Sequence, residues 1–167
     1  NIIDPIGLAE KYGTDSVRYS LLRNSVFEDS DYSEKLLVER HNNELANKLG
    51  NLVSRVSSLI EKYGIEKSEN TLLKKLNLKE IDKLFENYEL DKALSEIFAF
   101  TDICNEYVQK NKIWETGNKK QLHELVESIK AIAELLWPFI PETSEKIQKI
   151  FSAKSIKKSE VLFKKIE

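Results

Sequence analysis

The 167 residues, 41% of them hydrophobic and 32% charged, with only five glycines and three prolines, suit one compact domain and disfavour a sheet-rich or disordered chain. The formal charge is −2, from 26 Lys and Arg against 28 Asp and Glu, which disfavours a nonspecific polyanion binder because such a protein carries a strong basic excess. The expected fold class is therefore all-α, and any nucleic-acid contact is expected to be local.

Two short helices are predicted at the start of the chain. Asp4 and Pro5 open the first, which runs to Tyr12, because Pro suits the first helical turn and Gly13 suits a C-terminal stop. Thr14 is the predicted cap of the second helix. The apolar face of that helix is predicted to hold Val17, Leu21 and Leu22.

A long amphipathic helix is predicted after a polar, acidic loop with the sequence NSVFEDSDYS. The helix begins at its cap, Ser33, and ends at Gly64, since glycine favours a left-handed C-terminal stop. Apolar residues recur in it at alternating steps of four and three, as in a single buried stripe: Leu45, Leu49, Leu52, Val56, Leu59 and Tyr63. About thirty residues make the helix roughly 45 Å long at 1.5 Å per residue.

Two helices are predicted in the middle of the chain. Asn77, with Glu80 three residues later, resembles a capping box and starts the first of them. The second begins at Leu90, and its buried stripe keeps the helical spacing as far as Trp114. Gly117 and the following Asn interrupt the pattern there.

Two more helices and a basic tail are predicted at the end of the chain. One helix builds the core up to Leu136 and is broken by Pro138. Thr143 or Ser144 caps the last helix, which runs to about Phe151. The tail carries a small apolar cluster, Val161 to Phe163, that can dock as an extended segment. The predicted architecture is an up-and-down helical bundle preceded by short connecting helices.

Motifs for catalysis and for metal binding are mostly missing. The sequence has no P-loop and no Gly-rich dinucleotide turn, and His41 and His123 lack metal-ligand spacing with each other or with Cys104. We interpret His41 as a helix-surface histidine and give His123 a similarly structural role. Cys104 lies on a core stripe and is interpreted as packing. No metal site is expected.

The acidic loop is not interpreted as a catalytic site. Glu28, Asp29 and Asp31 are read as a solvated loop, because general acid catalysis requires burial or a positioned partner. A single cysteine excludes an intrachain disulfide. Neither an apolar run of about 18 residues nor a signal-peptide pattern occurs, so we expect no membrane association and a cytoplasmic location.

One flank of the long helix carries polar side chains beside the buried stripe. Asn51 and Arg55 are four residues apart, which places their Cβ atoms about 6 Å from each other, and Asn47 and Lys48 share the flank. An amide and a guanidinium so placed can present donors and an acceptor to the edge of a nucleic-acid base. The alternative is a solvated face with an incidental hydrogen bond.

Trp114 is the second candidate for contact with a base. On the predicted helix it aligns with Phe100 and Tyr107 at the edge of the buried stripe, where a half-exposed indole can stack on an unpaired base. The alternative is a Trp that packs the end of a bundle. Trp137, in the apolar run LLWPF, is assigned to the core. Nearby phosphate partners are predicted to be Lys110, Lys112, Lys119 and Lys120.

Four motifs, in this order, resemble the C-terminal half of the methionyl-tRNA synthetases, a family of class I aminoacyl-tRNA synthetases. They are YGTDSVRYSLLR, SDYSEKLLVERHNNELANKLGNLVSR, NEYVQKNKIW and PFIPETSEKI, and the match runs from Asn1 to about Phe151. The resemblance implies a segment 1–32 that connects to a catalytic domain and contacts the tRNA stem. It also implies an anticodon-binding bundle over 33–151, followed by a C-terminal tail over 152–167.

The resemblance further implies which residues read the tRNA. In the family the bundle binds the CAU anticodon of methionine tRNA, and the matching positions here are Asn51 and Arg55 for hydrogen bonds to the bases and Trp114 for stacking. Asn105 and Tyr107 match supporting residues of the motif. The family usually has Pro before this Trp, whereas this sequence has Ile113. The positions expected to contact the tRNA backbone are Arg18, Arg23, Lys48, Lys110 and Lys112.

The resemblance also bears on enzymatic activity. The full-length parent is expected to join methionine to its tRNA with ATP, whereas ATP, methionine and zinc belong to a catalytic domain that precedes this sequence. We therefore expect no catalytic residue and no cofactor in the chain itself, and we expect the parent's own catalytic domain as a partner. Two alternatives stay open: the corresponding domain of a leucyl, isoleucyl or cysteinyl synthetase, and a helical bundle that mediates only protein contacts.

Overall fold

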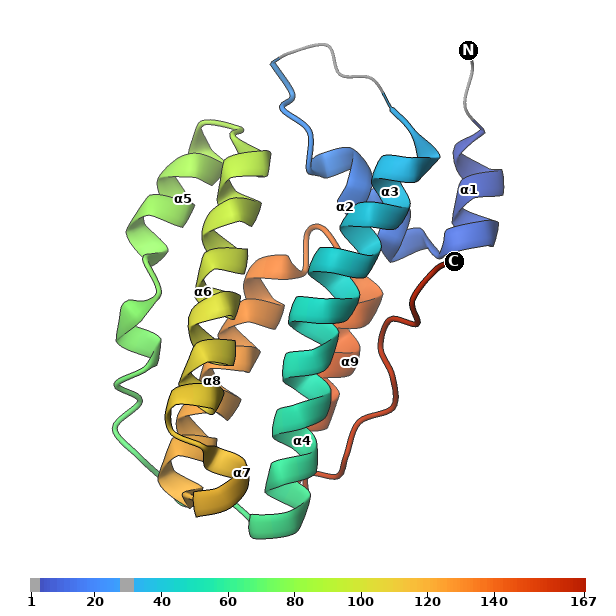
Figure 1. Cartoon of the computed structure of the whole chain (residues 1–167). Coiled ribbons are helices and arrows are strands. Elements are labelled where there is room, and N and C mark those ends of the chain that lie inside the picture. Colours follow the sequence, from blue (N-terminus) through green and yellow to red (C-terminus); the bar gives the residue numbers. More distant parts are fainter. Residues whose placement is uncertain (1–3, 28–31) are drawn as a thin grey trace.

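The computed structural model of the protein describes residues 4–27 and 32–167, and all regular structure in these ranges is helical. The elements are α1 (Pro5–Tyr12), α2 (Thr14–Leu22), α3 (Glu34–Arg40), η1 (His41–Gly50), α4 (Asn51–Tyr63), η2 (Leu73–Lys75), α5 (Leu78–Glu86), α6 (Leu90–Lys110), α7 (Ile113–Thr116), α8 (Lys119–Leu136) and α9 (Pro141–Phe151). Figure 1 shows α4, α6, α8 and α9 side by side along the long axis of the molecule, with α1 and α2 at one end and α7 at the other. The prediction of an all-α, up-and-down bundle is confirmed.

The long helix is formed by α3, η1 and α4 without interruption. The Ser33 hydroxyl accepts a hydrogen bond from the backbone N–H of Leu36 at 3.1 Å, and Gly64, at φ +80°, ends the helix. Both predicted ends are therefore confirmed. The ten residues of η1 form a π-helix, which the sequence pattern did not predict. Because a π-helix has more residues per turn, angles based on 3.6 residues per turn hold in α3 and from Asn51 onward, but not across η1.

Two predictions about α2 are wrong. Thr14 is the first residue of the helix and not its cap, because Gly13 ends α1 and also occupies the cap position of α2. Leu21 is exposed, whereas Tyr19 is fully buried. The reason is that α2 contacts α1, α3 and α9, so its buried surface is wider than one apolar stripe.

The helix that begins at Leu90 ends at Lys110 and does not reach Trp114. Lys112 adopts a left-handed conformation at φ +45°, which separates α6 from the one-turn helix α7. Trp114 therefore lies on a different helix from Tyr107. Phe100 is buried and does not lie at the edge of the stripe. The predicted aromatic row is wrong for these two reasons.

The end of the bundle differs from the prediction at two further places. The helix α9 starts at Pro141, whose fixed φ suits a first helical position, and Thr143 and Ser144 lie buried inside its first turn instead of capping it. Trp137 is 54% exposed, so its assignment to the core is wrong. It follows the last residue of α8, and its indole N–H donates to Glu145 at 3.4 Å, while neighbouring apolar residues fill the core.

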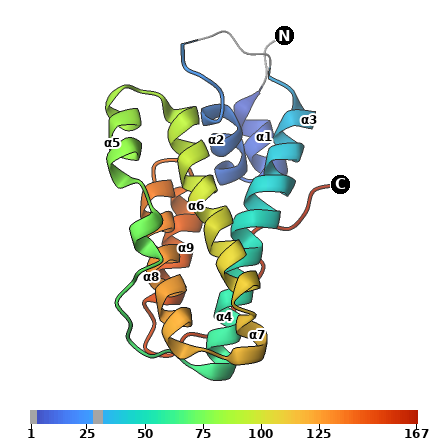
Figure 2. The ribbon, with the colours of Figure 1, turned by 60° about the vertical axis from the view of Figure 1, so that its left-hand side comes forward.

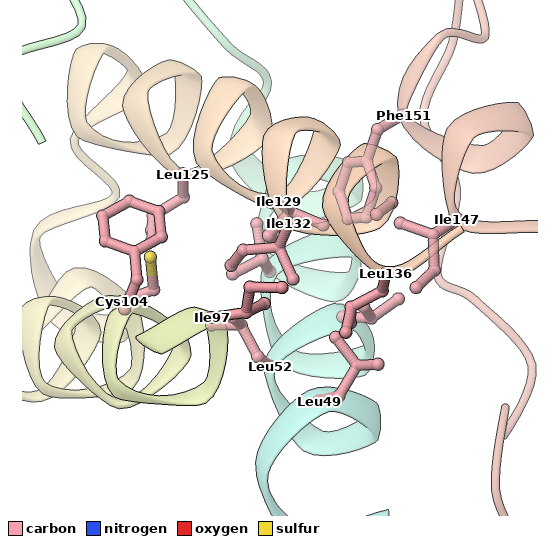
Figure 3. Packing of buried hydrophobic residues seen from close by; sticks show 14 of the residues in the cluster. Leu49, Leu52, Ile97, Cys104, Leu125, Ile129, Ile132, Leu136, Ile147 and Phe151 are labelled. Atoms are coloured by element: carbon pink, nitrogen blue, oxygen red, sulfur yellow. The ribbon is translucent and has the colours of Figure 1, made fainter. Parts of the chain in front are cut away.

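The main core lies where the long helix, α6, α8 and α9 meet (Figure 3). Residues that contribute to it are Leu49, Leu52, Ile97, Cys104, Leu125, Ile129, Ile132, Leu136, Ile147 and Phe151. Burial raises the pKa of the Cys104 thiol to about 12, so its predicted role in packing is confirmed.

The C-terminal tail packs in an extended form along the long helix and returns toward α1 (Figure 1). The Asn42 amide donates to the carbonyl of Ile166 at 2.8 Å and accepts from its N–H at 2.9 Å.

His41 is buried and not on the surface as predicted: its Nε2 lies 2.7 Å from the carbonyl of Lys164 and its Nδ1 lies 2.9 Å from the hydroxyl of Ser16. Since a carbonyl only accepts, Nε2 donates and Nδ1 accepts.

The acidic residues of the loop before Ser33 cannot be compared with the prediction. Glu28, Asp29 and Asp31 lie outside the described residues. His123, on α8, is half-buried, and its Nδ1 lies 3.1 Å from the hydroxyl of Ser68, which agrees with the structural role predicted for it.

Candidate nucleic-acid interface

Arg55 lies at an open depression of about 450 Å³ between α4 and α6. The other residues that line the depression come from α6: Asp102, Asn105, Glu106, Gln109 and Lys110. Figure 2 shows α6 passing in front of the long helix on this side of the molecule. The structure therefore brings Arg55 and Asn105, two of the predicted residues, to one surface.

The charges around this depression are largely paired with each other. Asp102 forms an ion pair with Lys48 at 2.6 Å, and Glu106 forms one with Lys110 at 2.9 Å. Within residues 4–27 and 32–167, the half-buried Arg55 side chain makes no hydrogen bond and no ion pair. The carboxylates are thus neutralised by other partners, and the guanidinium of Arg55 keeps its five donors for a ligand.

Asn51 lies one turn before Arg55 on α4 and is exposed. Its side chain makes no hydrogen bond in the described part of the chain, and it does not line the depression. Because α4 is a regular α-helix here, the two side chains stay neighbours on one face. Asn47, in η1, is also exposed.

Asn105 and Tyr107, the predicted supporting residues, hold α6 to the segments around it. The Asn105 amide donates to the carbonyl of Lys48 at 3.3 Å and to that of Thr101 at 3.2 Å, which connects α6 to η1. The Tyr107 hydroxyl donates to the buried carboxylate of Glu124 on α8. Burial, together with this carboxylate, raises the pKa of Tyr107, so the hydroxyl stays protonated and remains a donor.

Trp114 lies on α7, at the end of the bundle where α4 also ends (Figures 1 and 2). Its side chain is 40% exposed, which leaves part of the indole surface open for stacking. It does not line the depression at Arg55. The structure thus places the reading and stacking candidates at two positions on neighbouring helices, and does not gather them in one pocket.

The five residues expected to contact the tRNA backbone all have partners inside the protein. On α2, Arg18 donates to the carbonyls of Pro138 and Phe139 at 2.6 and 3.2 Å, which joins α2 to the turn before α9. Lys48 and Lys110 have the ion pairs described above, and Lys112 lies 4.0 Å from a carboxylate oxygen of Glu115.

Arg23 is the most embedded of these five. Its guanidinium donates to the carbonyl of Asp91 at 2.9 Å and to the hydroxyl of Ser95 at 3.0 Å, and it forms an ion pair with Glu44 at 3.3 Å. Burial lowers the pKa of Arg23, but the Glu44 carboxylate outweighs this effect and the net shift is upward. Arg23 therefore connects α2 with η1 and α6.

Two residues that matter for the site were not singled out from the sequence. Tyr63 donates from its hydroxyl to the carbonyl of Trp114 at 2.9 Å, although the helical spacing indicated only a place on the core stripe. Glu124 is a buried carboxylate that holds Tyr107. The sequence signal that could have identified Glu124 as a buried carboxylate was its position beside Leu122 and Leu125, inside an apolar helix face.

Other site types find no support in the part of the chain that the structure describes. No group of three or more His, Cys, Asp or Glu side chains in these ranges could hold a metal ion. No helix in the same ranges has the length and hydropathy needed to cross a membrane.

Two family models match the sequence. The model described as the anticodon-binding domain of tRNA ligase matches residues 69–166, and the model described as tRNA synthetases class I (M) matches residues 1–57. The methionine–tRNA ligase of Clostridium acetobutylicum is 36% identical, over 89% of this chain and 26% of its own length. That of Bacillus subtilis is 33% identical, over 88% of this chain and 25% of its own length. The chain thus spans about a quarter of these curated relatives.

Solved structures show the same fold. The apo form of Mycobacterium tuberculosis methionyl-tRNA synthetase superposes with a TM-score of 0.88 at 23% identity, over 99% of this chain and 41% of that one. A structure of the same enzyme bound by methionyl-adenylate has a TM-score of 0.81 at 29% identity, over 90% of this chain and 34% of that one.

Proposed function

We propose a function from one premise, that this chain belongs to the family of anticodon-binding domains of tRNA ligases, of the methionyl-tRNA synthetase type. Its function is to bind methionine tRNA and to recognise the CAU anticodon. The observation that carries this proposal is the guanidinium of Arg55, which is unpaired among the described residues and lies in an open depression between α4 and α6.

Arg55 and Asn51 are proposed to read base edges. The planar guanidinium of Arg has several donors, and the amide of Asn has both donors and an acceptor. The two side chains can therefore form hydrogen bonds with the donors and acceptors on the edge of an unpaired base. The bases of a single-stranded loop can leave their stack and present these edges. Since Asp102 and Glu106 are held by lysines, they repel an incoming phosphate less than free carboxylates would.

Trp114 is proposed to stack on an anticodon base. A partly exposed indole supplies a flat apolar surface, and stacking of a base on such a ring contributes about 1–3 kcal/mol. Stacking has little sequence preference, because every base has a π-face. Specificity is therefore assigned to the α4 pair and affinity to the α7 indole.

The activity of a longer protein is part of the same proposal. Because the chain spans about a quarter of its curated relatives, ligation of methionine to tRNA with ATP, and any zinc site, are proposed for a catalytic domain outside this sequence. That domain is also the proposed partner of this one, and the cytoplasm, where tRNA is aminoacylated, is the proposed location.

Titration with labelled RNA tests the proposal. A fluorescein-labelled stem-loop with the CAU anticodon, compared with the same stem-loop carrying a scrambled anticodon, should bind at least tenfold more tightly, and binding should quench tryptophan fluorescence. Equal affinity for both loops would remove the specificity assigned to α4. A preference for a leucine, isoleucine or cysteine stem-loop would indicate another class I synthetase. A complete lack of salt-dependent quenching by any tRNA would indicate a bundle that binds only proteins.

A further inference from the structure

The helix that carries Trp114 cannot be stable on its own. It has only four residues, and one turn of helix fixes many backbone angles for very few hydrogen bonds. The turn before it includes Lys112 at φ +45°, a conformation that costs free energy for a residue other than glycine. The position of the indole must therefore depend on contacts between α7 and the rest of the bundle.

One side chain and two hydrogen bonds hold the turn α7 in place. Ile113 is completely buried and anchors the start of the turn in the main core. At the other end, the N–H of Gly117 donates to the carbonyl of Ile113 at 2.9 Å. The carbonyl of Trp114 has no acceptor role inside so short a helix and needs a donor from elsewhere. The Tyr63 hydroxyl, at the end of α4, provides that donor at 2.9 Å.

Gly117 allows the Tyr63 ring to pack directly against the turn. A Cβ atom at this position would lie 2.6 Å from Cδ1 of Tyr63, which is closer than atoms can approach without movement. Gly117 also has φ +57°, which favours glycine. The ammonium of Lys62 lies 4.6 Å from the centroid of the same ring. Tyr63 is thus fixed by ring contacts as well as by its hydrogen bond.

We propose that Tyr63 is the positioning residue of the stacking surface, and this inference rests on the proposed function. Tyr63 lies on the same rigid helix as Asn51 and Arg55, about 12 Å along the axis from Arg55 at 1.5 Å per residue. By holding the carbonyl of Trp114, it ties the stacking residue to the helix that reads the bases. One helix then sets the spacing between the two functions.

A conservative variant of Tyr63 tests the inference in a background that isolates Trp114. Trp137→Phe removes the only other tryptophan, and this residue is exposed and distant in sequence from the site. In that background Tyr63→Phe keeps the ring and removes only the hydroxyl. Time-resolved fluorescence anisotropy of the free protein should then show a wider local motion of Trp114. Affinity for the CAU stem-loop should fall by about 2- to 10-fold, the range expected for one hydrogen bond.

Matched variants separate positioning from a general loss of stability. Tyr88→Phe removes the hydroxyl of a 70% exposed tyrosine that makes no side-chain hydrogen bond in the described ranges, and it should change neither measurement. Gly117→Ala keeps the Tyr63 hydroxyl but displaces the ring or the turn, and it should widen the motion of Trp114 in the same way. Thermal unfolding followed by circular dichroism identifies the temperature range in which each variant is folded.

The outcomes distinguish the inference from the proposed function. Unchanged motion of Trp114 in folded Tyr63→Phe overturns the inference, whether or not affinity falls, because the residue then acts in another way. If the unmodified protein does not bind the CAU stem-loop, the proposed function fails, while the anisotropy of the free protein still decides whether Tyr63 holds the indole. Wider motion with weaker binding supports both.

Discussion

The carboxylate of Glu124 on α8 accepts a hydrogen bond from the hydroxyl of Tyr107 on α6. The same carboxylate accepts two more from Thr71, one from its hydroxyl and one from its backbone N–H at 2.7 Å. Glu124 is 6% exposed, so these three donors replace water around a buried charge. One side chain thus connects two bundle helices with the segment between α4 and α5.

This arrangement predicts a pH-dependent contribution to stability. Burial raises the pKa of Glu124, but the hydrogen bonds from Thr71 and Tyr107 outweigh it and the net pKa lies below the usual value of 4.5. Because the folded pKa is lowered, the ionised Glu124 stabilises the fold above the unfolded pKa, and the stabilisation is lost as pH falls through the folded pKa. Glu124→Gln should lower the free energy of unfolding at pH 7 by about 1–2 kcal/mol.

Urea unfolding at several pH values measures this effect. The difference between the unmodified protein and Glu124→Gln should shrink as the pH is lowered from 7 to 3. Glu127→Gln on the same helix is a suitable control, because Glu127 is paired only with Lys130 at 3.3 Å and is less buried. A difference that stays constant over this pH range would contradict the assignment of the stabilisation to the charged form.

Trp114→Ala should weaken binding of the CAU stem-loop by about 1–3 kcal/mol, because it removes the stacking surface. Trp114→Phe should recover part of that loss, since a smaller aromatic ring still stacks. Fluorescence anisotropy of the labelled stem-loop gives both dissociation constants. Trp137→Ala is the control, because this exposed indole lies beyond the end of α8. Affinities that are equal for Trp114→Ala and the unmodified protein would exclude stacking at this position.

Arg55→Ala should reduce the preference for CAU over a scrambled anticodon by about 1–3 kcal/mol, as expected for the loss of a bidentate contact with a base. The salt dependence of binding should stay nearly unchanged, since a base contact releases no counterion. Titrations at two salt concentrations with both stem-loops measure these quantities together. Equal weakening for the two loops, with a shallower salt dependence, would show that Arg55 contacts phosphate instead.

Much of the fold follows from local sequence signals. The cap at Ser33, the stripe from Leu45 to Leu59 and the glycine at position 64 defined the long helix, because each depends only on residues near it in the chain. The up-and-down order of α6, α8 and α9 follows from the short connections between these helices. None of these signals depends on a residue that is distant in the sequence.

The features that the sequence did not predict depend on distant residues. His41 is predicted to lie on a helix surface, because no motif surrounds it in the sequence, yet it is buried because the C-terminal tail brings Lys164 to its ring. Trp137 lies in an apolar run, yet it is exposed because the chain turns toward Pro141 immediately after it. For the site, the flank with Arg55 was visible from the helical period, whereas the contact between Tyr63 and Trp114 joins residues 51 positions apart.

The start of α9 provides the last prediction. Thr143 does not cap this helix; instead Asp15, on α2, accepts hydrogen bonds from its N–H at 2.7 Å and from its hydroxyl at 2.6 Å. All these atoms are buried, so Asp15→Ala would leave two donors without an acceptor and should lower the free energy of unfolding by about 1–3 kcal/mol. Asp4→Ala, which removes the exposed and purely local cap of α1, should cost less. Urea unfolding of the two variants compares these effects. The helix α2, which carries Asp15, lies at the opposite end of the bundle from α7 (Figure 1). The affinity of folded Asp15→Ala for the CAU stem-loop should therefore be unchanged, and a weaker affinity would show that α2 and α9 also position the anticodon surface.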